Sequence, residues 1–176
     1  VIAGLALAGV ALLAGNGIPL PQTSREWGVV CGLGFFGIFL YGLCFFFGLQ
    51  RISAGRGALV VALNPVMVVI AAWLFGQERM TPRKALGSAI ALAGCLTVIG
   101  NGDPLALLHG TVGLGEWLIV GCVVSWTAYT FIGRQATKTL SPLATTLHGS
   151  LVGALLLGLA ALVQGDIEPA AWSRRV

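Results

Sequence analysis

Long apolar runs separated by short polar stretches dominate this chain. A membrane-spanning helix needs about 20 consecutive apolar residues, and six runs come close to that length. Their apolarity is continuous, whereas a barrel strand would alternate over about ten residues. The pattern therefore predicts an all-α, polytopic membrane helix bundle with about six transmembrane helices, over 1–19, 28–49, 57–75, 82–99, 113–132 and 142–163.

The third run carries Asn64-Pro65 near its centre. Proline removes a helical hydrogen bond and leaves a carbonyl without its partner. Inside a membrane this is tolerated where protein or a water-filled cavity satisfies the backbone. We therefore expect an interrupted helix at a place where a solute could bind, with a simple structural kink as the alternative.

Composition excludes a soluble protein. Hydrophobic residues make up 57% of the chain and charged residues only 9%, whereas soluble domains carry about 25% charge. The net charge of +4 does not indicate nucleic acid, because the basic residues are scattered between apolar runs. We also expect an internal part of a longer membrane protein, since residue 1 already lies inside an apolar run.

Other motifs point to packing rather than to a cofactor or metal. The four cysteines lie within apolar runs at irregular spacing, so we expect neither zinc nor disulfides. Gly32 to Gly37 reads GxGxxG, but it lies inside a spanning run with no acid at the required distance. Such glycines, and the pairs Gly28-xxx-Gly32 and Gly149-xxx-Gly153, favour close helix packing. No phosphate-binding loop is present, so the sequence implies no ATP.

The loop charges predict an orientation. The loops after the first, third and fifth runs hold six basic residues, namely Arg25, Arg79, Arg83, Lys84, Arg134 and Lys138. The alternate loops hold Arg51 and Arg56. The positive-inside rule therefore places the first set in the cytoplasm, although Arg174 and Arg175 in the tail oppose this orientation.

Several of these features together resemble the EamA family of the drug/metabolite transporter superfamily. They are Ser53-Ala54, Asn64-Pro65-Val66, Trp73 to Glu78, Gly87, Gly94, and the run from Gly115 to Arg134. The resemblance implies a parent of ten helices in two inverted five-helix repeats. Residues 1–100 would then be the remainder of the first repeat, 101–112 an external linker, and 113–176 the start of the second repeat. A short likeness between residues 11–18 and 161–167 agrees with such repeats.

The resemblance also implies a function. We expect a multi-pass cell-membrane transporter or exporter of small metabolites, amino acids or drugs, working by alternating access. Its partners would be a small-molecule substrate and the lipid bilayer, with a homodimer left open. The sequence shows no HExxH, GxSxG elbow or buried carboxylate pair, so we do not expect an enzyme. A non-transporting membrane scaffold is the alternative.

Two groups of residues are candidates for function. The predicted substrate cavity contains Tyr41, Asn64, Pro65, Trp126, Tyr129 and His148. Its aromatic members suit flat or apolar solutes, and an intramembrane histidine is a functional hypothesis by default. For each of them, ordinary packing is the alternative. At the end of the third run, Glu78, Arg79, Arg83 and Lys84 predict a charge cluster, which we favour over proton coupling by Glu78.

Overall fold

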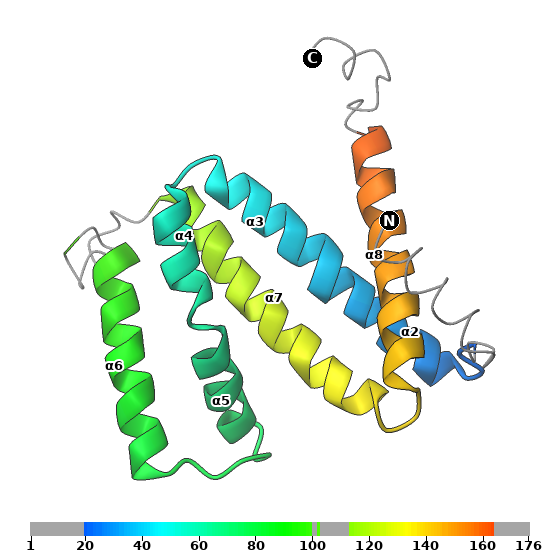
Figure 1. Cartoon of the computed structure of the whole chain (residues 1–176), viewed down its shortest axis with the longest axis horizontal. Helices are drawn as coiled ribbons and strands as arrows, with labels where there is room; N and C mark the ends of the chain where they lie inside the picture. The colour runs from blue at the N-terminus through cyan, green and yellow to red at the C-terminus, as the bar shows by residue number, and fades with distance from the viewer. Residues whose placement is uncertain (1–19, 100–101, 103–112, 164–176) are drawn as a thin grey trace. The chain divides into compact units, whose positions relative to one another are not determined.

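The computed structural model describes residues 20–99, 102 and 113–163, and the regular elements in these ranges are all helical (Figure 1). They are α2 (Ser24–Gly34), η1 (Phe35–Leu40), α3 (Tyr41–Leu49), α4 (Ala54–Val61), α5 (Asn64–Leu74), α6 (Pro82–Ile99), α7 (Leu114–Ala136) and α8 (Pro142–Val163). The predicted first span, 1–19, lies outside the described residues. The all-α prediction is confirmed.

Four helical stretches in the described ranges are long and apolar enough to cross a membrane. They are Ser24–Leu49, Ala54–Leu74, Leu114–Ala136 and Pro142–Val163. The helix α6 has the bounds predicted for the fourth span, but it is not among these four. Its charged residues Arg83 and Lys84 leave an uncharged part that begins at Ala85. At 1.5 Å per residue this part covers roughly 22 Å, which is short for a hydrocarbon core of roughly 30 Å.

The second predicted span begins earlier in the structure than the apolar pattern suggested, at Ser24 rather than Gly28. A capping box explains the difference. The Thr23 hydroxyl oxygen accepts a hydrogen bond from the Glu26 amide at 3.2 Å, and Glu26 Oε2 accepts one from the Thr23 amide at 3.2 Å. These two bonds satisfy amide groups that a helix start otherwise leaves unpaired. A π-helical segment, η1, then joins α2 to α3, and nothing in the sequence pattern predicted it.

The chain divides into two compact units. The first contains the described residues up to Phe39 together with those from Ile132 onward. Here α2 packs against α8, and the approach is close. A Cβ added to Gly34 would lie 2.7 Å from Val152, and one added to Gly153 would lie 2.5 Å from Ile38. These two glycines therefore allow the contact, whereas Gly28 faces open space.

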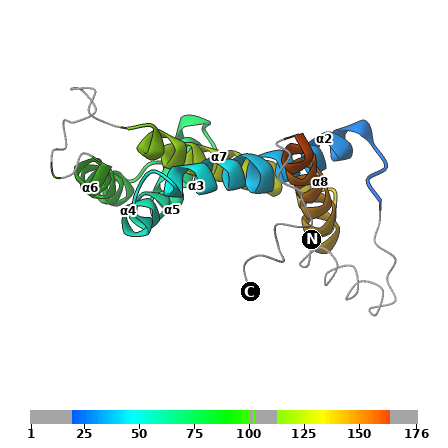
Figure 2. The ribbon, with the colours of Figure 1, turned by 90° about the horizontal axis from the view of Figure 1, so that it is seen from above.

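The second unit runs from Leu40 to Phe131. Its buried core comes from α4, α6 and α7, and consists of Val60, Cys95, Ile119, Cys122 and Val123. In this unit α3 and α7 run side by side (Figures 1 and 2). A Cβ added to Gly48 of α3 would lie 2.6 Å from Ile119 of α7, so the glycine allows this approach.

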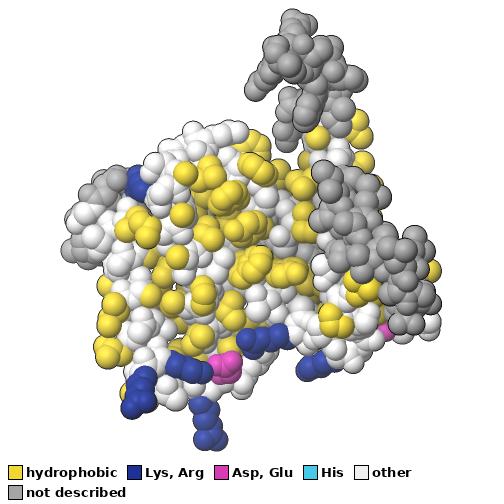
Figure 3. All heavy atoms as spheres, in the orientation of Figure 1, with side chains coloured by type: hydrophobic (Ala, Val, Ile, Leu, Met, Phe, Trp, Pro, Cys, Tyr) yellow, Lys and Arg dark blue, Asp and Glu magenta, His cyan; other side chains and the backbone are white. Residues whose placement is uncertain are grey.

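The surface has the division expected of membrane helices. Hydrophobic side chains spread over the visible faces of α3 and α7, and basic side chains gather at the end where α5 meets α6 (Figure 3). Large hydrophobic side chains are exposed on several helices, among them Phe46 on α3, Leu59 on α4, Trp73 on α5, and Leu86 and Ile90 on α6. An exposed apolar surface of this extent suits a hydrocarbon environment and not water.

Candidate functional site

An aromatic cluster joins α3 to α7 in the second unit. Tyr41 is the first residue of α3, and its ring centroid lies 5.8 Å from that of Trp126 on α7. The Trp126 ring lies 5.3 Å from that of Tyr129, and Tyr41 stacks on Phe45 at 5.9 Å. These separations are typical of favourable aromatic pairs. The structure therefore brings together three of the six predicted cavity residues, and Phe45 is a fourth aromatic that the sequence analysis did not select.

A contact to the backbone holds this cluster in place. The Cys122 thiol, one helical turn before Trp126, donates a hydrogen bond to the Tyr41 carbonyl at 3.6 Å. Cys122 itself is fully buried in the core, while 38% of Trp126 remains exposed. The cluster thus has a packed side against the core and an open side on which a ring could stack.

The predicted interruption at Asn64-Pro65 is present. The helix α4 ends at Val61, and α5 begins at Asn64 with Pro65 in its first turn. Between them the Leu63 amide donates to the Val60 carbonyl at 3.1 Å, a tighter step than the α-helical one. Pro65 is tolerated at this position because a helix start leaves its first amides unpaired in any case.

The side chain of Asn64 is unusual. Its Oδ1 atom is buried, and it accepts no hydrogen bond within the part of the chain that the structure describes. An unsatisfied buried amide oxygen costs about 1–3 kcal/mol. None of the ring contacts or hydrogen bonds found for the described residues joins Asn64 to the aromatic cluster. Asn64 and Pro65 belong to the same unit as that cluster, but they lie on a different helix, α5.

An apolar cavity of about 180 Å³ lies beside the helix break. Its walls come from α4, α5, α6 and α7, together with Leu63 between α4 and α5, and are Val60, Leu63, Met67, Leu92, Cys95, Leu96, Trp117, Val120, Val123 and Val124. None of the predicted cavity residues lines it. No signal in the sequence could have found it, because these residues have the same helical spacing as any lipid-facing or packed surface.

His148 lies in the first unit, on α8. It is buried, and its Nδ1 lies 2.7 Å from the Ala144 carbonyl one turn earlier. Because a carbonyl only accepts hydrogen bonds, this contact assigns the proton to Nδ1. The contact fits the packing alternative for His148.

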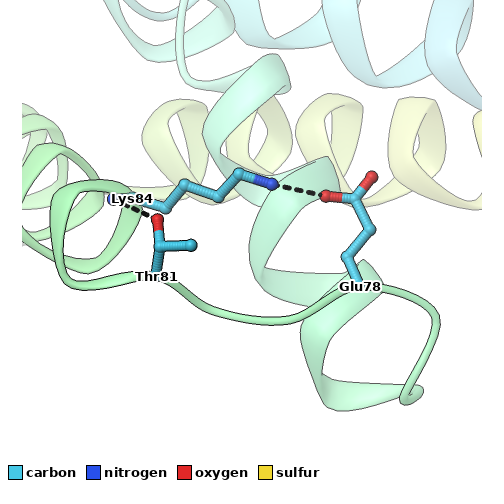
Figure 4. A network of polar contacts seen from close by, with 3 residues as sticks. All are labelled: Glu78, Thr81 and Lys84. Atoms are coloured by element: carbon cyan, nitrogen blue, oxygen red, sulfur yellow. Dashed lines mark hydrogen bonds and ion pairs between the residues drawn. The ribbon is translucent and has the colours of Figure 1, made fainter.

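Of the predicted charge cluster, the structure shows one ion pair, Glu78–Lys84, in the region between α5 and the start of α6 (Figure 4). Lys84 Nζ lies 2.8 Å from Glu78 Oε2, and the Lys84 amide donates to the Thr81 hydroxyl at 3.3 Å. Thr81 thus caps α6. Arg79 and Arg83 are exposed in the same region. An exposed ion pair of this kind contributes little to stability.

A second ion pair was missed by the sequence analysis. Arg56 Nη2 of α4 lies 3.0 Å from Glu116 Oε1 of α7, and Glu116 is buried. The same Arg56 nitrogen donates to the Val98 carbonyl of α6 at 3.2 Å. A signal was available, since opposite charges stand at the starts of two spans predicted to run in the same direction. No group of His, Cys, Asp and Glu able to hold a metal occurs among the described residues.

Comparison with known proteins gives one family and several relatives. The model of the EamA-like transporter family matches residues 1–100 and 113–176. An uncharacterized transporter of Bacillus subtilis, YyaM, is 32% identical over 84% of this chain and 48% of its own length. A probable terminal-alkyne amino-acid exporter of Streptantibioticus cattleyicolor is 26% identical over 89% of this chain and 53% of its own.

A third relative is the aromatic amino acid exporter YddG of Ancylobacter novellus, 25% identical over 93% of this chain and 55% of its own length. The chain thus spans about half the length of these curated relatives. No solved structure matches it.

Proposed function

Because this chain belongs to the EamA-like transporter family, we propose that the full-length protein is a secondary transporter that exports small metabolites, amino acids or drugs across the cell membrane. Two relatives are named as amino-acid exporters, which supports this substrate range. The four membrane-length helices among the described residues support a location in the lipid bilayer. We propose no enzymatic activity and no cofactor.

The proposed architecture is a ten-helix parent with two inverted five-helix repeats. Residues 1–100 would complete the first repeat, 101–112 would form an external linker, and 113–176 would begin the second repeat. Transport would proceed by alternating access between the repeats. The family match on both sides of residues 101–112 supports this division.

The aromatic cluster is the single observation that carries the substrate proposal. Tyr41, Trp126 and Tyr129 present neighbouring rings from two helices, and Trp126 keeps an open face. Such a surface stacks on a flat ring and packs against an apolar side chain, and its hydroxyl groups offer polar contacts. We propose that it contacts the substrate, with an aromatic or apolar amino acid as the fitting chemical class.

Asn64 would supply a polar contact. Its buried Oδ1 has an acceptor site that a substrate N–H could fill, and this would recover the cost of leaving it unpaired. Pro65 would hold the helix break that exposes this part of the backbone. The hydrogen bond between His148 and the Ala144 carbonyl favours a packing role. We therefore propose no substrate contact for His148.

Efflux from cells that express the full-length protein tests the proposal. Cells preloaded with radiolabelled phenylalanine or alanine should export the label faster than cells with an empty vector. We expect Trp126→Ala to slow phenylalanine export about tenfold and alanine export much less. Trp73→Ala is the matched control, because Trp73 is exposed on α5 outside the aromatic cluster.

Two results would count against the proposal. If Trp126→Ala and Trp73→Ala have the same effect at equal expression, the aromatic cluster does not contact the substrate. If the wild type exports no solute from a broad panel of amino acids and drugs, the scaffold alternative gains support.

A further inference from the structure

A polar pocket of about 310 Å³ lies in the first unit, whereas the aromatic cluster belongs to the second unit. It forms where α2 begins and α7 ends. Arg25 lines it from the first turn of α2, and Lys138 lines it from the turn that follows α7. Thr139 and Gln135 add a hydroxyl and an amide. Its volume is at the lower end of the range for small-molecule sites, which begins at about 300 Å³.

The charge of this pocket favours an anion. Arg25 and Lys138 supply two positive charges, and Glu26 supplies the one carboxylate in the lining. Glu26 Oε2 already accepts hydrogen bonds from the Gln22 amide at 2.7 Å and from the Thr23 amide at 3.2 Å. This oxygen therefore caps the N-terminus of α2. The two cations remain the dominant charge toward a ligand.

The position of the pocket indicates where that ligand comes from. It sits at the ends of two membrane-length helices, Ser24–Leu49 and Leu114–Ala136. Trp27, in the first turn of α2, is exposed, and tryptophan is enriched at the level of the lipid headgroups. Val29 provides an apolar wall on the side toward the middle of the helix. Headgroup phosphates lie at this level, with their acyl chains beyond it.

We propose that this pocket binds the phosphate of an anionic lipid headgroup, with Arg25 and Lys138 as its two cationic contacts. Both side chains belong to exposed residues, so they would hold a free phosphate only weakly. A lipid is confined to the bilayer by its chains, which raises its effective concentration at the pocket. Each basic side chain near the headgroups strengthens the binding of an anionic lipid roughly fivefold.

Native mass spectrometry of the delipidated full-length protein tests this site. The probes are dioctanoyl phosphatidylglycerol, dioctanoyl phosphatidylcholine, and inorganic phosphate as a competitor. We expect the wild type to prefer phosphatidylglycerol, and Arg25→Gln/Lys138→Gln to weaken its binding roughly 10- to 30-fold. Arg25→Lys/Lys138→Arg keeps both charges and should retain the binding.

The matched control is Arg79→Gln/Arg83→Gln, which removes the same charge from the exposed region between α5 and the start of α6. It should change the binding less than about twofold, because these residues lie outside the pocket. Equal losses in the two glutamine variants would overturn the proposal in favour of general surface charge. Unchanged binding in Arg25→Gln/Lys138→Gln would overturn it as well. Displacement of the lipid by millimolar inorganic phosphate would overturn the lipid assignment and give the pocket to a free anion.

Salt provides a measurement that needs no variant. Because the two cations are exposed, raising the ionic strength should weaken phosphatidylglycerol binding to the wild type and leave phosphatidylcholine binding nearly constant. Should Arg25→Gln/Lys138→Gln aggregate, the salt dependence is compared between the wild type and Arg79→Gln/Arg83→Gln. A salt dependence that this control variant loses would overturn the proposal, and one that it keeps supports the pocket. A phosphatidylglycerol affinity that does not change with salt would overturn the proposal.

Discussion

Arg56 and Glu116 connect α4 to α7 through an ion pair of 3.0 Å between Nη2 and Oε1. Each residue lies in the first turn of its helix, and the Arg56 guanidinium also donates to the Val98 carbonyl near the end of α6. One side chain therefore connects three helices of the second unit. Glu116 is well placed, because a negative charge near a helix N-terminus is stabilised by the helix dipole.

Breaking this pair should destabilise the protein. Glu116→Ala removes the carboxylate beside the partly buried Arg56 guanidinium, and we expect a loss on the order of 2–3 kcal/mol. Lys84→Ala is the control, because it breaks the exposed pair with Glu78 and should cost less than about 1 kcal/mol. Thermal unfolding of the full-length protein in detergent measures both. Equal melting temperatures for the two variants would show that the Arg56–Glu116 pair stabilises the fold no more than the exposed Glu78–Lys84 pair does.

The turn between α5 and α6 should face the cytoplasm, because Arg79, Arg83 and Lys84 lie in it or directly after it. Single cysteines placed in this turn and in residues 101–112 of a cysteine-free protein test the orientation. An impermeant thiol reagent applied to intact cells should label the cysteine in 101–112 and spare the one in the turn. The opposite pattern would reverse the proposed topology.

The pocket at Arg25 and Lys138 bears on the same question. Both residues line one pocket, so the two segments that carry them lie at the same end of the first unit. The positive-inside rule had predicted that both loops lie on one side of the membrane. Their proximity agrees with that prediction, and the labelling experiment tests whether this side is the cytoplasm.

Pro65 should hold the break between α4 and α5. In Pro65→Ala the residue gains an amide, so a continuous helix through Ala62 and Leu63 becomes possible. We expect export by the full-length protein to fall about tenfold while its level in the membrane falls less than twofold. Spin labels on exposed positions of α4 and α5 would report the straightening as a longer distance. An unchanged distance together with normal export would mean that Pro65 does not set the break.

The sequence predicts the helices well because membrane spans depend on continuous apolarity, which is a local property. The break at Asn64-Pro65 and the start of α6 at Thr81-Pro82 follow from proline chemistry, which is local too. No sequence pattern predicted the π-helical segment η1. For the Arg56–Glu116 pair, the opposite charges at the starts of two spans were visible in the sequence, but which helices meet was not. The same holds for the apolar cavity, whose lining looks like ordinary helix packing.

The aromatic cluster is an intermediate case. The sequence supplied Tyr41, Trp126 and Tyr129 as candidates, and the pairing of α3 with α7 was needed to bring the first to the other two. His148 shows the reverse, because a rare intramembrane histidine drew attention, and its Nδ1 contact with Ala144 fits packing. The role of these residues in transport stays a prediction.

The glycines of α2 provide a matched pair for testing the helix contact in the first unit. A Cβ at Gly34 would lie 2.7 Å from Val152 and 2.8 Å from the Gly149 carbonyl oxygen, whereas one at Gly28 would meet nothing within 4 Å. Because a backbone oxygen on α8 cannot move aside easily, Gly34→Ala should cost about 1–3 kcal/mol. Gly28→Ala should gain up to about 1 kcal/mol, since alanine favours the helix. The melting temperature in detergent should therefore fall for the first variant and hold or rise for the second. Equal shifts would show that α2 and α8 do not pack closely against each other at Gly34.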